Sequence, residues 1–289
     1  MSETVTNMLN QVPDVPDRFY GVTEREACND TYDFVIQQVR RLGYAILDAG
    51  YTSEHLNQIS RSFDSIRKTY IANFGESALK EIDEYHTMRA LLTYESNSFL
   101  QLAMNQHVLA VVRKLISGKF VLNQQNGVIN PPGESYNQAA WHRDLPYQHY
   151  ISSTPLAINA LFCMDDFTCE NGATFIIPAS HKFTACPSED YVRQNAIQLI
   201  AKAGQFIILD CMTFHSGGFN KTSMERRAVN QVYTIPYFKQ QINLPQNIAN
   251  ASNLSDETRE FLGFSYQEPV SVKQYLLSRG LNREKSSMS

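Results

Sequence analysis

Apolar residues recur at helical spacing near the start of the chain. The four that set the pattern are Phe34, Val35, Val39 and Leu42. This spacing predicts a helix over residues 31–42, and Gly43 is a natural end for it because glycine readily adopts the left-handed conformation that follows a last turn. The apolar residues 44–47 then predict a short buried strand, whereas the polar residues 1–25 predict a loose arm.

Two further helical stretches follow in this part of the chain. Thr52 or Ser53 can cap the first, whose apolar stripe consists of Leu56, Ile59, Phe63 and Ile66. The second covers residues 99–116, with a break expected near Asn105. The pattern therefore predicts a mainly helical layer over residues 31–118.

After Gly118 the pattern changes to short apolar runs separated by turn residues. Candidate strands cover residues 120–130, 157–164, 173–177, 205–209 and 227–237. Turn signals such as Glu170-Asn171-Gly172 and Gly217-Gly218 lie between them. Short strands at this spacing are typical of a sandwich or an open barrel, so residues 119–240 are expected to form a jelly-roll core.

Residues 241–289 are expected to be a C-terminal extension of this core. They contain one candidate helix over residues 272–279, which Gly280 would end. No internal repeat or low-complexity linker divides the sequence, so residues 1–289 are expected to form a single domain. The expected fold class is an all-β core with an α layer, in which N-terminal helices flank a jelly roll.

Composition narrows the classes of function that remain. The 289 residues are 43% hydrophobic, which is enough for one well-packed core. A net charge of −4 gives no reason to expect nucleic acid or an anionic membrane as a partner. No apolar run approaches the roughly 20 residues of a spanning helix, and the first residues lack the features of a signal peptide. Five cysteines without a CxxC pair argue against a disulfide framework or a structural zinc site and favour a reducing cytoplasm.

Three residues have the pattern of a metal site. His142 and Asp144 are separated by one residue, so both side chains point to the same side of a strand. His215 follows the apolar run 206–209, which places it at the mouth of a barrel. An HxD tripeptide alone is weak evidence, because it also occurs by chance. Two histidines and one carboxylate on one face of a metal, however, form the facial triad of non-haem Fe(II) oxygenases, so the three residues together predict a ferrous iron site.

Arg226 and Arg227 open the strand that follows His215. By strand alternation only one of the two should face inward. A buried arginine needs an anionic partner, and its planar guanidinium matches a carboxylate with two hydrogen bonds. A dicarboxylic co-substrate would supply that partner. The alternative is that both arginines are solvated or pair with Glu225.

Four segments carry a resemblance to a known family, and they occur in order along the chain. They are Gly43 to Leu47, Trp141 to Asp144, Asp165 to Lys182, and His215 with the glycines and Arg226 that follow it. Together they resemble the phytanoyl-CoA dioxygenase family of Fe(II)- and 2-oxoglutarate-dependent oxygenases, from about Gly43 to Pro236. The resemblance implies a cupin-like double-stranded β-helix. It also implies that His142, Asp144 and His215 bind the iron and are catalytic.

The resemblance further implies that Arg226, rather than Arg227, binds the distal carboxylate of 2-oxoglutarate. Many members of the family place a serine or threonine two residues further on to share this carboxylate, whereas this chain has Ala228 there. Either another hydroxyl, such as that of Thr213 or Ser216, replaces it, or fewer bonds hold the carboxylate.

Four successive amides, residues 123–126, lie on a predicted strand that resembles the co-substrate-contacting strand of this family. One alternate pair must face inward, and buried amides need partners. Asn123 and Gln125 are the expected contacts to 2-oxoglutarate, and Asn159 is a weaker case of the same kind. The alternative is that the inward pair bonds only to neighbouring side chains.

The resemblance implies an enzyme that uses Fe(II), 2-oxoglutarate and O2, releases succinate and CO2, and hydroxylates an unactivated C–H bond. No basic cluster suits the phosphates of coenzyme A, so the expected partner is a small free metabolite of the biosynthetic or secondary-metabolite type. Two alternatives are a cupin-type iron oxygenase without 2-oxoglutarate and a non-catalytic module that binds the metal or 2-oxoglutarate. Arg226 disfavours the first and the intact triad disfavours the second.

The substrate-binding residues are expected in three places around the triad. Arg89 belongs to an N-terminal segment that often covers the site in this family, and Tyr147 and His149 lie in the loop after Asp144. Phe219 and Asn220 follow His215. The sequence carries no feature that sets the oligomeric state.

Overall fold

The computed structural model describes residues 15–145, 151–249 and 251–287. Its helices are α2 (Thr31–Leu42), α3 (Ser53–Phe74), α4 (Glu76–Glu81), α5 (Ser96–Ala103), α6 (Gln106–Leu115), α7 (Glu189–Asn195), α8 (Leu244–Asn247), α9 (Asp256–Phe261) and α10 (Val272–Ser287). Its strands are β1 (Tyr44–Asp48), β2 (Thr87–Met88), β3 (Val121–Asn130), β4 (Ala157–Cys163), β5 (Phe175–Ile176), β6 (Ile197–Gln198), β7 (Gln205–Asp210), β8 (His215–Ser216) and β9 (Arg226–Thr234).

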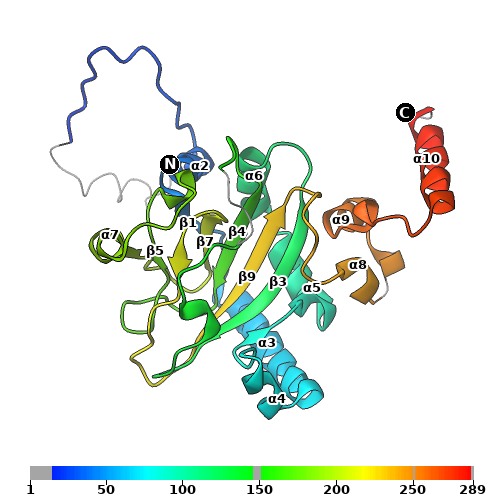
Figure 1. Cartoon of the computed structure of the whole chain (residues 1–289), viewed down its shortest axis with the longest axis horizontal. Helices are drawn as coiled ribbons and strands as arrows, with labels where there is room; N and C mark the ends of the chain where they lie inside the picture. The colour runs from blue at the N-terminus through cyan, green and yellow to red at the C-terminus, as the bar shows by residue number, and fades with distance from the viewer. Residues whose placement is uncertain (1–14, 146–150, 250, 288–289) are drawn as a thin grey trace.

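The strands form two antiparallel sheets. The larger sheet has six strands in the order β1-β7-β4-β9-β3-β2, and the smaller has three in the order β6-β5-β8. Strands that are neighbours in space are mostly distant in sequence, because the chain crosses repeatedly between the sheets. This arrangement is the expected jelly roll. Figure 1 shows the long strands β3, β9 and β4 side by side, and α10 apart from both sheets.

The larger sheet is covered on both faces, and its inner strands β4 and β7 are therefore mostly apolar along their length. In β7, Phe206 and Ile208 belong to the core that the sheet shares with α2, α3, α5 and α6. Ile207 and Leu209 belong to a second core, which includes Phe167 and Ile176 of the segment that forms the smaller sheet. Strand alternation therefore sends every second residue toward the helices and the others into the space between the sheets.

Gly43 joins the helical layer to the larger sheet. It follows α2 with φ 87°, a conformation that is costly for residues with a Cβ atom. A Cβ at this position would also lie 2.3 Å from Thr213 Oγ1 and 2.7 Å from His181 Nδ1. The position therefore needs glycine both for the backbone turn and for the close approach of the loop that precedes β8.

The elements that hydrophobic periodicity predicted are present with small shifts at their ends. α2 covers residues 31–42 as expected, and Thr52 caps α3 through its side chain. Asn105 marks the expected break, because its side chain accepts hydrogen bonds from the first residues of α6. The predicted strands correspond to β3, β4, β5, β7 and β9.

One predicted boundary is wrong. The last helix does not end at Gly280, because α10 continues through it to Ser287. A glycine inside a helix costs only about 1 kcal/mol relative to alanine, so it does not by itself end a helix. The helices α4, α7, α8 and α9 were not predicted. Among the described residues, no helix is both long and apolar enough to cross a membrane.

Candidate metal centre and its arginine pocket

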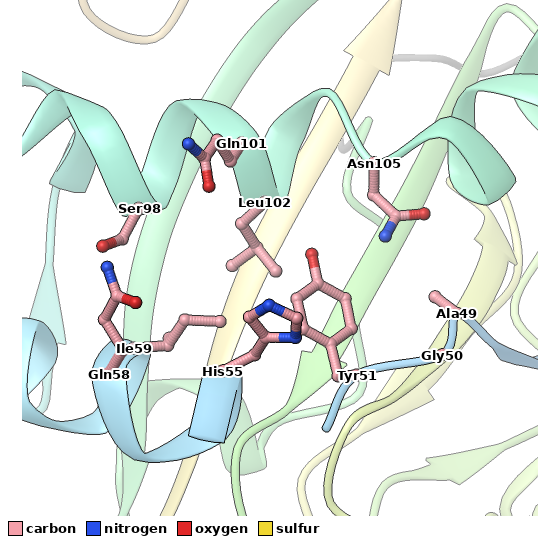
Figure 2. Close-up of a pocket in the computed structure, with 10 residues that line it drawn as sticks. All are labelled: Ala49, Gly50, Tyr51, His55, Gln58, Ile59, Ser98, Gln101, Leu102 and Asn105. Carbon is pink, nitrogen blue, oxygen red and sulfur yellow. The ribbon is translucent and has the colours of Figure 1, made fainter. Parts of the chain in front are cut away.

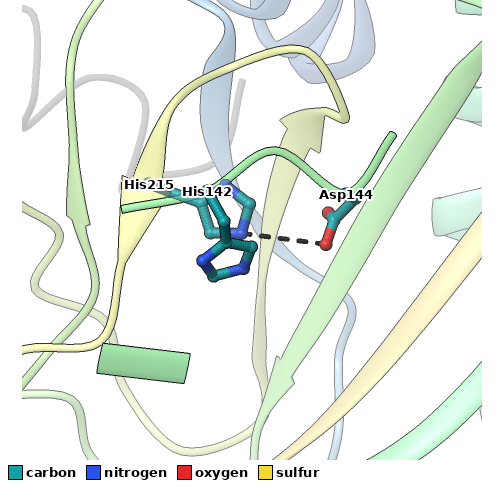
Figure 3. A group of neighbouring side chains, drawn as sticks. All are labelled: His142, Asp144 and His215. Atoms are coloured by element: carbon teal, nitrogen blue, oxygen red, sulfur yellow. Dashed lines mark ion pairs between the residues drawn. The ribbon is translucent and has the colours of Figure 1, made fainter. Parts of the chain in front are cut away.

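The structure brings His142, Asp144 and His215 together between the two sheets. One ligand atom from each lies within 4.8 Å of the other two, and His215 Nε2 is 3.8 Å from Asp144 Oδ1. Figure 3 shows the two imidazole rings and the carboxylate gathered around one point. The histidines belong to adjacent backbone segments, since His142 and His215 exchange two backbone hydrogen bonds of 3.0 and 3.1 Å as an antiparallel bridge beside β8. The triad predicted from the sequence is therefore a single cluster.

Backbone carbonyls orient both imidazole rings. His142 Nδ1 lies 2.7 Å from Ala140 O, and His215 Nδ1 lies 3.0 Å from Thr213 O. A neutral imidazole with its proton on Nδ1 donates a hydrogen bond to the carbonyl, and its Nε2 keeps a free lone pair. This carbonyl arrangement is typical of metal-bound histidines, whose second nitrogen is fixed by a hydrogen bond.

Asn159 orients the carboxylate of the triad. Its Nδ2 donates a hydrogen bond of 2.8 Å to Asp144 Oδ2, whereas Asp144 Oδ1 faces His215. Asn159 comes from the inter-sheet face of β4 and is 1% exposed. The sequence placed this residue among the co-substrate contacts. The contact in the structure is to Asp144, which makes Asn159 an outer support of the metal ligand.

The donor set fits a ferrous ion. Two imidazole nitrogens and one carboxylate are the ligands of the facial triad, and all three residues are at least half-buried. Burial and the neighbouring His215 lower the pKa of His142, which keeps its imidazole neutral at neutral pH. Neutral imidazole is the form that binds a metal.

Arg143, between the two ligands of the HxD tripeptide, holds the backbone of the site in place. Its guanidinium lies 3.9 Å from the centre of the Phe214 ring. It donates hydrogen bonds to the backbone carbonyls of Met212, Ser180, Thr184 and Phe183. Because these bonds tie the tripeptide to the segment before His215 and to the turn at residues 180–184, Arg143 fixes the spacing of the ligands.

Arg226 is buried in the same inter-sheet space without an anionic partner among the described residues. It is 3% exposed, and its guanidinium lies 3.9 Å from the centre of the Phe167 ring. Its one hydrogen bond goes from Nη2 to the hydroxyl of Tyr136, at 3.3 Å, and its buried Nε has no partner. Burial lowers the pKa of Arg226. A buried guanidinium with free N–H groups has the chemistry to bind a carboxylate.

Arg227 lies on the opposite face of the larger sheet. Its guanidinium pairs with Asp165 at 2.9 Å and with Asp64 of α3 at 3.1 Å, and it also donates to Ser60. The expectation that only one of the two arginines faces inward is confirmed. Glu225 pairs with Arg67 rather than with either of them.

The structure contradicts the expectation for Asn123 and Gln125. Gln125 pairs in register with Gln231, five residues from Arg226 along β9, so it faces the helices and donates to Phe99 O of α5 at 2.7 Å. Asn123 lies at the other end of β3 and donates to Thr234 and to Lys239 O. It is seven residues, roughly 23 Å of extended strand, from Asn130, which pairs with Arg226. Neither amide can reach a molecule that Arg226 holds.

The predicted substrate residues have different positions. Asn220 is fully buried, and its amide bonds to Asn130 O, to Met224 O and to Thr222, which contradicts a substrate contact because no part of it is accessible. Phe219, in contrast, is 55% exposed. Arg89 is half-buried and its guanidinium pairs with Glu84. Tyr147 and His149 lie outside the described residues.

Sequence reasoning missed Tyr136. This residue follows β3, is 6% exposed, and carries the one hydroxyl that contacts Arg226 among the described residues. The two hydroxyls suggested in its place bond elsewhere: Thr213 donates to Gly43 O and Ser216 to Ala139 O. No local pattern marks Tyr136, because its contact joins residues 90 positions apart.

A separate cavity of about 180 Å³ lies on the helix-covered side of the larger sheet. Figure 2 shows it between the chain at Tyr51, the start of α3 at His55, and α5 with Ser98 and Gln101. The Tyr51 ring packs against Phe162, a residue of β4 that faces the helices. The cavity is therefore on the other side of the sheet from the triad and forms no part of the metal centre.

Comparison with known proteins gives a consistent assignment. The sequence profile of the phytanoyl-CoA dioxygenase (PhyH) family matches residues 39–228. The uncharacterized protein Rv1501 of Mycobacterium tuberculosis is 26% identical over 254 residues, which cover 86% of this chain and 92% of that protein. Dioxygenase FUM3 of Gibberella moniliformis is 25% identical over 282 residues, which cover 91% of each chain.

A solved structure also has this fold. The crystal structure of EctD from S. alaskensis with 2-oxoglutarate and 5-hydroxyectoine superposes with a TM-score of 0.61 at 19% sequence identity. The match covers 75% of this chain and 82% of EctD. At this identity the likeness concerns the fold, a jelly roll with flanking helices.

Proposed function

The chain belongs to the phytanoyl-CoA dioxygenase family, and on that premise we propose that it hydroxylates an unactivated C–H bond of a small free metabolite. It is an Fe(II)- and 2-oxoglutarate-dependent dioxygenase, which releases succinate and CO2. His142, Asp144 and His215 hold the iron, and Arg226 holds the distal carboxylate of 2-oxoglutarate. The iron, when bound, supplies the activation of O2 for the hydroxylation.

The main observation that supports these residue roles is the burial of the Arg226 guanidinium. It lies in the space between the sheets that also holds the triad, and no carboxylate of the described residues accepts its free N–H groups. An iron oxygenase without 2-oxoglutarate has no use for such an anchor. A dicarboxylic co-substrate compensates the charge and completes its hydrogen bonds.

The protein's own residues prepare this reaction. The carbonyls of Ala140 and Thr213 keep the imidazole protons on Nδ1, so the opposite nitrogens stay free for the metal. Asn159 keeps one carboxylate oxygen of Asp144 engaged. The inter-sheet core, with Phe167 over the guanidinium of Arg226, excludes water and strengthens the attraction of the arginine for an anion.

The chain's net charge and one protein of the same fold support a small substrate. A net charge of −4 gives the chain as a whole no electrostatic attraction for a phosphate-rich thioester such as an acyl-CoA. EctD, which has the same fold, was crystallised with the small molecule 5-hydroxyectoine. We propose a small, phosphate-free metabolite as the substrate of this chain as well, with Phe219 and Arg89 at its binding site.

The test is succinate formation by the iron-loaded protein with 2-oxoglutarate and a panel of small amines, acids and polyketide-like alcohols, with an acyl-CoA thioester as the comparison. A true substrate should raise succinate release and give a product with one added oxygen, and His142→Ala should abolish both. Release of succinate only with an acyl-CoA thioester would contradict the proposed substrate class. If a product forms but no succinate is released, the proposed co-substrate would be contradicted.

A further inference from the structure

Tyr136 lies between β9, which contains Arg226, and the residue that follows β8, which contains His215. Its hydroxyl accepts a hydrogen bond from Arg226 Nη2, at the start of β9. The hydroxyl end of the phenol also packs against Gly217, directly after β8 and two residues after His215. A Cβ on Gly217 would lie 2.2 Å from the Tyr136 oxygen, so only glycine leaves room for the phenol here. The side chain therefore occupies a fixed place between the arginine and the metal-ligand strand.

The hydrogen-bonding capacity of this phenol is incomplete. In the bond with Arg226 the guanidinium donates and the tyrosine oxygen accepts, because arginine has no acceptor. The phenolic proton is thus free to be donated, and no acceptor for it exists among the described residues. The buried O–H of Tyr136 therefore lies beside the buried cation Arg226, whose Nε has no partner. One anion could accept hydrogen bonds from both groups.

Strand β9 itself offers no hydroxyl for this task. Ala228 is the next residue that faces the same way as Arg226, and it packs in the core with Phe167 and Cys163. The hydroxyls of Thr213 and Ser216 donate to backbone carbonyls. Tyr136 is therefore the hydroxyl in place to complete the pocket.

We propose that the Tyr136 hydroxyl donates a hydrogen bond to the distal carboxylate of the co-substrate, as a second anchor beside Arg226. The proposal rests on the proposed function, because it requires that 2-oxoglutarate binds at Arg226. It adds a specificity-determining residue: Tyr136 selects a five-carbon keto acid that ends in a carboxylate over one that ends in a methyl group.

The test compares two co-substrate probes on the anaerobic Fe(II)-loaded protein by calorimetry. 2-Oxoglutarate has the distal carboxylate, and 2-oxopentanoate has the same length and keto acid end without it. Tyr136→Phe should weaken 2-oxoglutarate binding roughly 10- to 100-fold, the loss of one hydrogen bond to a charged group. It should leave 2-oxopentanoate binding unchanged, which also shows that the variant is folded.

Tyr233→Phe is the matched control. It also removes one buried tyrosine hydroxyl, which bonds to Ala103 O at 2.9 Å on the helix-covered face. It should leave the affinity for both probes unchanged. Equal losses for both probes in Tyr136→Phe would overturn the proposal and assign the phenol a packing role, and unchanged 2-oxoglutarate binding would overturn it too. Failure of the unaltered protein to bind 2-oxoglutarate would instead refute the proposed function on which it rests.

Discussion

Arg226 and Arg227 are consecutive residues, yet their guanidinium groups lie on opposite faces of one sheet. Arg226 is 3% exposed, faces the smaller sheet and contacts Phe167 and Tyr136. Arg227 faces the helices and pairs with Asp165 and Asp64. The protein therefore compensates the charge of Arg227, whereas Arg226 has no carboxylate partner among the described residues.

Replacement of these two arginines should separate binding from stability. Arg226→Met should weaken 2-oxoglutarate binding about 30-fold or more, because truncating one partner of a buried charge pair costs about 2–5 kcal/mol. Arg227→Met should leave this affinity unchanged. Calorimetric titration of the anaerobic Fe(II) forms measures both. Equal loss of affinity in the two variants would contradict the assignment of Arg226.

The same pair should behave in the opposite way in thermal unfolding without ligands. Arg226→Met should leave the melting temperature unchanged or raise it, because it removes a buried cation that lacks a carboxylate partner. Arg227→Met should lower it, because it leaves Asp165 without its partner. A drop in melting temperature confined to Arg226→Met would show that Arg226 is a structural residue.

Asn159→Ala should weaken Fe(II) binding about 10- to 100-fold, the usual effect of losing an outer partner of a metal ligand. The hydrogen bond from Asn159 to Asp144 is the one lost. Gln125→Ala is the control, because this buried amide lies on the other face of the sheet. Competition with a chelator measures both affinities, and an equal loss in the two variants would contradict the role of Asn159.

Asp210 makes stability depend on pH. Burial raises its pKa from 3.8 to about 6, with Arg143 and Lys182 as the cations that oppose the shift. A raised folded-state pKa means that the stabilising effect of the protonated form is complete below pH 3.8 and is lost as the pH rises through about 6. Asp210→Asn, which keeps the acceptor for Met212 N, should therefore stabilise the fold by up to about 3 kcal/mol at about pH 7.5 and by roughly half of that at about pH 5. Urea unfolding at both pH values measures this, and a gain that does not grow with pH would contradict it.

Gly43, which follows α2, can be compared with Gly50, which follows β1, to separate backbone strain from close packing. Both have positive φ, 87° and 71°, but a Cβ on Gly43 would overlap Thr213 and His181, whereas nothing lies within 4 Å of one on Gly50. Gly50→Ala should cost about 1–2 kcal/mol from backbone strain alone. Gly43→Ala should cost about 1–3 kcal/mol more from overpacking. Equal losses in chemical unfolding would contradict the close packing seen at Gly43.

The features that the sequence predicted well depend on local patterns. The stripe of apolar residues in α2 and the alternation that separates Arg226 from Arg227 need only a few neighbouring positions. The clustering of His142, Asp144 and His215 was predictable because His142 and Asp144 share one side of an extended segment and His215 follows a buried strand.

The features that failed depend on pairing between distant segments. In residues 123–126 four amides follow one another, so no contrast between apolar and polar residues tells which pair faces inward. A bulge between Leu122 and Gln124 also breaks the alternation, and the register with β9 decides the faces. Tyr136 lies in a loop, and only the folded chain brings it to Arg226.

Anaerobic visible absorbance on addition of Fe(II) and then 2-oxoglutarate shows whether the co-substrate binds to iron held by His142, Asp144 and His215. A keto acid that chelates ferrous iron in a triad with open positions gives a weak metal-to-ligand charge-transfer band. The band should form in the unaltered protein, be absent in His142→Ala, and require a higher 2-oxoglutarate concentration in Arg226→Met. Bound iron without this band at saturating 2-oxoglutarate would contradict the proposed co-substrate and indicate an iron protein that does not use 2-oxoglutarate.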